Sequence, residues 1–106
     1  MRNLVRLATS IPPPIYVWYR NEGLAAGLNP SWAMRRGLKA YVDYVGDGDA
    51  PPVPELQDFL RQVKTVVYVR LEAETAEAID RIAKRLDVTP RTALRLGLAW
   101  YWARNR

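Results

Sequence analysis

The second half of the chain shows the clearest alternation of apolar and polar positions. Residues 65–71 (TVVYVRL) carry Val67, Val69 and Leu71 at a spacing of two, which predicts a β-strand with one buried side. In residues 75–86 the apolar positions recur at spacings of three and four with charged residues opposite, which predicts an amphipathic helix. The apolar stripe of that helix consists of Ala78, Ile79, Ile82, Ala83 and Leu86.

A second helix is expected after a short turn. Asp87 and Val88 interrupt the helical periodicity, and Thr89 offers a side-chain oxygen as N-cap. Pro90 fits the first helical position, where its missing N–H is no loss. The pattern therefore predicts a strand, a helix, a turn and a final helix that runs close to the end of the sequence.

The first half of the chain repeats parts of this pattern at two different offsets. Residues 29–41 (NPSWAMRRGLKAY) align with residues 89–101 (TPRTALRLGLAWY) at an offset of 60, with six identities in thirteen positions. Residues 15–19 (IYVWY) align with residues 67–71 (VYVRL) at an offset of 52. Because the two offsets differ by eight residues, the first copy is expected to lack about two helical turns between its strand and its last helix.

The first copy is therefore expected to have a strand at residues 15–19, with Ile15, Val17 and Tyr19 pointing inward. Its middle helix is reduced to roughly residues 22–27, and its final helix begins with Asn29 as N-cap and Pro30 as first residue.

A connector between the two copies is expected from composition. Residues 46–54 are rich in Gly, Asp and Pro, and residues 55–63 predict a short helix with an apolar face of Leu56, Phe59, Leu60 and Val63. The predicted divisions are an arm of unassigned structure at residues 1–13, a degenerate first copy at 14–45, a linker with a short helix at 46–63, and a second copy at 64–106.

The two final helices share an apolar seam that we assign to the core. A glycine stands in the middle of each seam, where it costs near 1 kcal/mol against alanine, so the two helices are expected to cross closely there. The matching seam positions are Met34, Gly37, Leu38 and Tyr41 in one helix and Leu94, Gly97, Leu98 and Tyr101 in the other. Leu96, Trp100 and Trp102 lie outside the seam, which predicts contact with the connector helix or self-association with a second chain.

Composition and charge narrow the functional classes. The chain has no Cys and no His, so thiolate or imidazole metal sites and Ser-His or Cys-His catalytic pairs are excluded, and we expect neither an enzyme nor a cofactor. No apolar run suggests a signal peptide or a membrane span, so we expect a cytoplasmic protein without a membrane partner. Residues 1–44 and 64–106 each carry a net charge of +4 and residues 45–63 carry −3, which suits two surfaces facing a polyanion.

The order strand, helix, helix resembles the ribbon-helix-helix superfamily of MetJ, Arc and CopG. The resemblance is carried by residues 67–71 (VYVRL), by the helix after Ala73, and by residues 87–94 (DVTPRTAL) leading into Gly97. It implies a mostly α-helical protein with a short two-stranded antiparallel β-ribbon that enters the DNA major groove. Since one copy leaves both strand edges unpaired, two copies must pair. We favour an intramolecular pseudo-dimer of the tandem copies, with strand exchange between two chains as the alternative.

The resemblance also implies which residues contact DNA. The outward positions of the strands would contact bases: Tyr16, Trp18, Tyr68 and Arg70. The starts of the final helices, with one lysine beside the ribbon, would contact phosphates: Asn29, Ser31, Trp32, Lys64, Thr89, Arg91 and Thr92. As an alternative, Tyr16, Trp18 and Tyr68 cover another protein surface, such as the connector helix.

These observations predict a sequence-specific protein for double-stranded DNA that acts as a transcriptional repressor. Two alternatives stay open at this point: an antitoxin-like DNA-binding protein, and a protein-interaction module that has lost DNA binding.

Overall fold

The structure is a computed structural model that describes residues 4–46, 48, 61 and 64–106. It is mostly helical, with one two-stranded antiparallel sheet. The elements follow one another as β1 (Leu4–Ile11), α1 (Pro13–Ala25), α2 (Pro30–Val45), β2 (Thr65–Glu72), α4 (Ala73–Leu86) and α5 (Pro90–Asn105). The expected fold class of helices with a short antiparallel ribbon is confirmed at this level.

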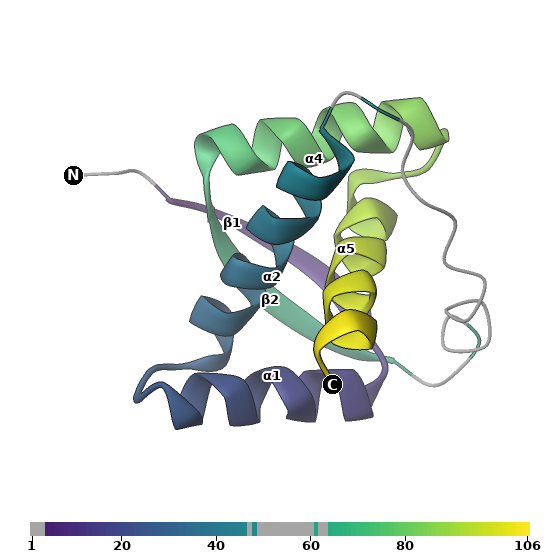
Figure 1. Cartoon of the computed structure of the whole chain (residues 1–106). Coiled ribbons are helices and arrows are strands. Elements are labelled where there is room, and N and C mark those ends of the chain that lie inside the picture. The colour runs from purple at the N-terminus through teal and green to yellow at the C-terminus, as the bar shows by residue number, and fades with distance from the viewer. Residues whose placement is uncertain (1–3, 47, 49–60, 62–63) are drawn as a thin grey trace.

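The two strands come from opposite halves of the chain and form one layer of the molecule. β1 pairs with β2 in an antiparallel register that joins Leu4 to Glu72 and Ile11 to Thr65. Figure 1 shows the crossed strands behind the helices, with α2 and α5 side by side in the middle and α1 and α4 at opposite ends. In the described part of the chain, the core therefore lies between the inner face of the ribbon and the helices α1, α2, α4 and α5.

The strand predicted in the second half is confirmed as β2. Val67, Val69 and Leu71 are buried, and Val66, Tyr68 and Arg70 point outward and are exposed. The amphipathic helix predicted next is confirmed as α4, and its C-cap Asp87 adopts the left-handed conformation that ends the helix.

The strand predicted at residues 15–19 is wrong, because these residues lie inside α1. Pro13 and Pro14 occupy the first helical turn, where no backbone N–H is needed, so they start the helix rather than prevent it. Ile15 and Tyr19 are four residues apart and fully buried, whereas Val17 between them is 38% exposed. Burial with helical spacing outweighs the local β-propensity of this run.

The structure corrects two further predictions for the first half of the chain, the arm of unassigned structure and the shortened middle helix. β1 lies within the segment predicted as an arm, and α1 has 13 residues against 14 in α4, so no helical turns are missing from the first half. The predicted short helix at residues 55–63 falls outside the described part of the chain, apart from Arg61.

The close crossing of the two final helices is confirmed at their glycines. A Cβ atom on Gly37 would lie 3.0 Å from the Tyr101 ring of α5, and one on Gly97 would lie 2.8 Å from the Tyr41 ring of α2. The N-caps of these helices are also as predicted, since Asn29 accepts from the N–H of Trp32 and Thr89 from that of Thr92.

Trp100 and Trp102 are buried, as the apolar circumference of the last helix indicates. The Trp100 ring packs against Tyr41 and Tyr44 of α2, with ring centroids 5.5 and 4.9 Å apart. Arg104 covers the same ring at 4.9 Å. Among the described residues, Tyr41 and Tyr44 of α2 and Arg104 of α5 therefore cover Trp100. The connector helix predicted to contact this helix lies outside the described residues, and self-association through Leu96, Trp100 and Trp102 stays a prediction. Leu96 is half-buried.

Candidate nucleic-acid interface

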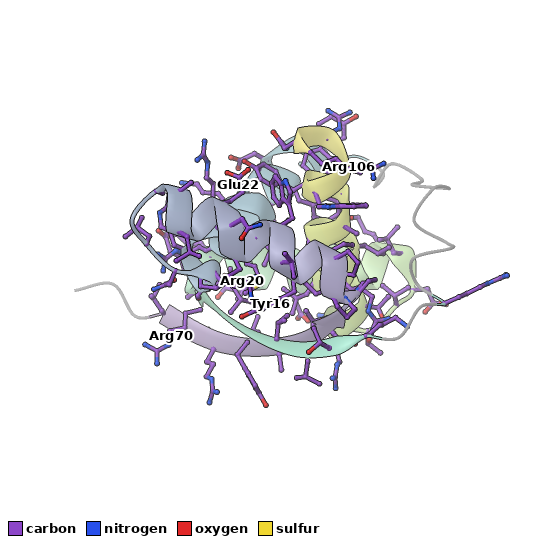
Figure 2. All side chains as sticks on the ribbon, turned by 90° about the horizontal axis from the view of Figure 1, so that it is seen from below. Tyr16, Arg20, Glu22, Arg70 and Arg106 are labelled. Atoms are coloured by element: carbon purple, nitrogen blue, oxygen red, sulfur yellow. The ribbon has the colours of Figure 1, made fainter. Side chains whose placement is uncertain are left out.

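The outer face of the ribbon carries the side chains that point away from the helices. Alternation along each strand puts three residues of β1 beside three of β2, in the pairs Arg6 with Arg70, Ala8 with Tyr68, and Ser10 with Val66. Figure 2 shows Arg70 on the ribbon side of the molecule and Arg106 on the opposite side, beyond the helices. The face is therefore open to a ligand that approaches the ribbon.

Two arginines stand directly opposite each other on this face. Arg6 and Arg70 are both exposed, and the Arg6 guanidinium lies 4.2 Å from the centroid of the Tyr68 ring. Within the described residues no carboxylate pairs with either guanidinium. Like charges directly opposite in an antiparallel pair are unfavourable, so this end of the ribbon is suited to an anionic or acceptor-rich partner.

The other end of the ribbon is held by a third arginine. Arg95 of α5 donates from Nε to the Ser10 backbone oxygen at 2.7 Å and from Nη2 to the Ser10 Oγ at 2.8 Å. Burial, and then the nearby charge of Arg91, lower the pKa of the Arg95 guanidinium below its ordinary value. Because it is half-buried and already hydrogen-bonded, Arg95 positions Ser10 and supports the ribbon from behind.

The starts of α2 and α5 flank the ribbon, each beside one strand. Thr9 Oγ1 of β1 donates to the Arg91 carbonyl oxygen in the first turn of α5 at 2.7 Å. The Arg70 N–H of β2 donates to Ser31 Oγ in the first turn of α2 at 3.4 Å. Each helix start is thereby fixed close to the edge of the outer face.

The residues predicted to contact phosphates gather mostly at these helix starts. Asn29 and Thr89 act as caps, Arg91 is exposed, and Thr92 is half-buried with its hydroxyl 3.0 Å from that of Thr89. Lys64 immediately precedes β2 and is half-buried. Ser31 lies beside Arg70 as described above. The structure thus brings six of the seven residues to the margins of the ribbon.

The predicted base contacts of Tyr16 and Trp18 are not supported by their positions, because both lie on α1 and not on the ribbon. Tyr16 is on the side of α1 toward the strands (Figure 2) and lines a groove with Asn29, Ser31 and the first half of β2. This groove lies beside the start of α2. Tyr16 is therefore near the candidate surface but does not point out from it.

Trp18 and Trp32 line a different hollow, of about 170 Å³, whose walls come from α1, α2 and α5. Tyr101 stands beside Trp18 there, with ring centroids 6.0 Å apart, and Arg36 lies 5.7 Å from the centroid of the Trp32 ring. Of the residues predicted to contact phosphates, Trp32 is therefore the one whose side chain lies away from the ribbon. Its backbone N–H still belongs to the first turn of α2.

Sequence reasoning missed Arg6, Ala8, Ser10 and Arg95 because it placed the first strand in the wrong segment. The sequence nevertheless contained a signal for the position of this strand. The offset of 60 that aligns the final helices, carried upstream, sets residues 7–11 against residues 67–71 and so places the strand correctly.

Comparison of the chain with protein-family models, curated proteins and solved structures finds no match. In the part of the chain that the structure describes, acidic side chains form no cluster that could hold a metal ion. Within the same residues, none of the helices is long and apolar enough to cross a membrane.

Proposed function

We propose that this protein binds double-stranded DNA sequence-specifically, with its β-ribbon in the major groove, and acts as a transcriptional repressor. In this proposal the chain is a tandem ribbon-helix-helix protein whose two halves pair within one molecule. The observation that carries it is the exposed ribbon face on which Arg6 and Arg70 lie opposite each other, flanked by the starts of two helices.

The equivalence of the two halves is supported by a single offset. At an offset of 60, Pro13 matches Ala73 and Pro30 matches Pro90, the first residues of the corresponding helices. The hydrogen bonds that end the first helix of each half match as well, since Leu28 N–H donates to the Gly23 carbonyl as Val88 N–H does to that of Ala83. Two halves with one plan and one shared ribbon are what an intramolecular pseudo-dimer requires.

The size and chemistry of the ribbon suit the major groove of B-DNA. That groove is about 12 Å wide and admits a two-stranded ribbon, and its base edges offer acceptors to arginine. Arg6 and Arg70 carry donors at one end of the outer face, and Val66 at the other end is apolar. Such a mixture of donors and apolar groups suits the reading of bases better than a uniformly basic face does.

The helix starts suit the phosphate backbone on either side. The first turns of α2 and α5 contain no acidic residue, whereas α4 has Glu74 in its first turn. The exposed N–H groups of a helix start carry a partial positive charge that a carboxylate would otherwise neutralise. In α2 and α5 this charge stays available for a phosphate.

The test is the affinity of the full chain for duplex DNA at several salt concentrations, with Arg70→Ala and Arg106→Ala compared. We expect affinity to fall steeply as salt rises, by roughly 0.9 in logarithmic slope for each phosphate contact. Arg70→Ala should lower the affinity for a preferred sequence about tenfold, and Arg106→Ala, on the opposite side of the molecule (Figure 2), should change it little. Weak binding without salt dependence would contradict the proposal.

A protein-interaction module is a second candidate, favoured by the exposure of Val66 and Tyr68. Each is 53% exposed on the outer face. Exposed apolar and aromatic groups side by side are typical of a protein interface. The same salt series distinguishes the two functions, because burial of apolar surface does not depend on released counterions.

A further inference from the structure

We propose that the ribbon recognises a DNA site without two-fold symmetry, with guanines at one end and a thymine at the other. This inference rests on the proposed function and adds the class of sequence that the surface would select. It follows from the antiparallel register, which determines the residues that lie together on the outer face.

The centre of the ribbon is the pair of Ala8 and Tyr68. These residues are sixty positions apart and lie opposite each other, so the pseudo-two-fold axis relating the halves passes between them. The axis relates Arg6 to Val66 and Ser10 to Arg70. In a symmetric homodimer related positions carry the same residue, and the operator is correspondingly palindromic. Here each related pair differs in chemistry.

Both arginines of the outer face consequently lie at one end. Directly opposed residues have Cβ atoms about 4.5–5.5 Å apart, so the guanidinium groups of Arg6 and Arg70 reach neighbouring base pairs. The Tyr68 ring, 4.2 Å from the Arg6 guanidinium, holds that side chain over the ribbon. Each guanidinium can donate two hydrogen bonds to the O6 and N7 atoms of guanine.

The other end offers an apolar group and a weak donor. Val66 is 53% exposed, and it suits the methyl group of thymine. The Ser10 Oγ accepts a hydrogen bond from Arg95, which leaves its hydroxyl proton free to donate to the thymine O4. Four residues of strand separate the two ends, about 13–14 Å, which equals about four base-pair steps.

The inference is tested by selecting bound duplexes from a random pool with the full chain. We expect one preferred sequence with guanine near one end, thymine about four base pairs away, and no palindrome. Arg6→Ala and Arg70→Ala should each relax the preference at the guanine end alone, with about tenfold loss of affinity. Ser10→Ala and Val66→Ala should relax only the thymine end, and Arg106→Ala should leave the selected sequence unchanged.

A double variant gives a positive test. Val66→Arg with Arg70→Val moves one guanidinium to the opposite end of the ribbon, so the selected site should gain a guanine there and lose one at the original end. A palindromic site selected by the unaltered chain, or single variants that relax both ends equally, would overturn the inference and leave DNA binding intact. Failure to bind or select any duplex would instead overturn the proposed function.

Discussion

Thr9 of β1 is joined to Arg91 of α5 by a hydrogen bond of 2.7 Å from the threonine hydroxyl to the arginine carbonyl oxygen. Thr9 is fully buried among mainly apolar side chains. The bond connects residues 82 positions apart and fixes the start of α5 against the ribbon. This contact links the stability of the fold to the geometry of the candidate interface.

Replacement of Thr9 by valine keeps the shape of the side chain and removes this hydrogen bond. We expect a loss of about 1 kcal/mol in the free energy of unfolding, measured by denaturant titration, because a typical intramolecular hydrogen bond contributes that much. If the start of α5 contacts phosphate, the affinity for DNA should also fall. Thr75→Val on the half-buried part of α4 serves as a control. Unchanged stability of Thr9→Val would show that the bond does not hold α5 in place.

Gly97→Ala should destabilise the protein although alanine is the better helix former. The added methyl group would lie 2.8 Å from the ring of Tyr41 and 3.0 Å from a methyl carbon of Leu38. Overpacking of this kind costs about 1–3 kcal/mol, which exceeds the gain of about 1 kcal/mol in helix propensity. Thermal unfolding should therefore show a lower midpoint. Gly48→Ala, whose Cβ would lie at an ordinary contact distance of 3.5 Å from the Val45 backbone oxygen, should leave it unchanged.

Gly23→Ala should be more damaging, because the neighbour is backbone rather than side chain. A Cβ atom there would overlap with the backbone carbonyl oxygen of Asn29, so the segment leading into α2 would have to move. We expect a loss of about 3 kcal/mol, at the upper end of overpacking effects, measured by denaturant unfolding. Ala83 occupies the matching place in the second half and is 1% exposed. Ala83→Gly should therefore cost only about 1 kcal/mol.

Stability should decline at alkaline pH because of Tyr19. Burial, and then the neighbouring Tyr101, raise the pKa of its phenol well above 10.0. Above pH 10 the unfolded chain releases this proton while the native chain keeps it, so the native state binds more protons and the free energy of unfolding falls as pH rises. The stabilisation that Tyr19 provides is fully present below pH 10 and is lost as the pH rises toward its raised pKa.

Tyr19→Phe removes this titration and should flatten the alkaline decline, seen in unfolding midpoints between about pH 8 and 11. Because burial also raises the pKa of Tyr41, part of the decline should remain. At pH 7 the variant should lose about 1 kcal/mol, since the Tyr19 hydroxyl donates to the Leu98 carbonyl. Tyr44→Phe, at a ring that is 51% exposed, is the matched control. A decline as steep in Tyr19→Phe as in the original chain would contradict the assignment.

Local signals in the sequence determined much of this protein. The period-two pattern of Val67, Val69 and Leu71 identified β2, and the stripe through Ile79 and Ile82 identified α4. Asn29 and Thr89 marked the starts of the last helices, because an N-cap acts within three residues of itself. The paired glycines indicated the helix crossing, since mid-helix glycine is costly without a close neighbour.

Tertiary contacts, and not local propensity, decided where the first strand lies. Residues 15–19 have strong β-propensity, yet they form part of α1, in which Ile15 and Tyr19 are fully buried. Conversely, apolar and polar residues do not alternate regularly in the sequence of β1. This segment is extended because β2 offers it a partner. The opposition of Arg6 and Arg70, on which the candidate site depends, arises from pairing between segments about sixty residues apart. Contacts at that separation depend on the whole packed core, and no local periodicity records them.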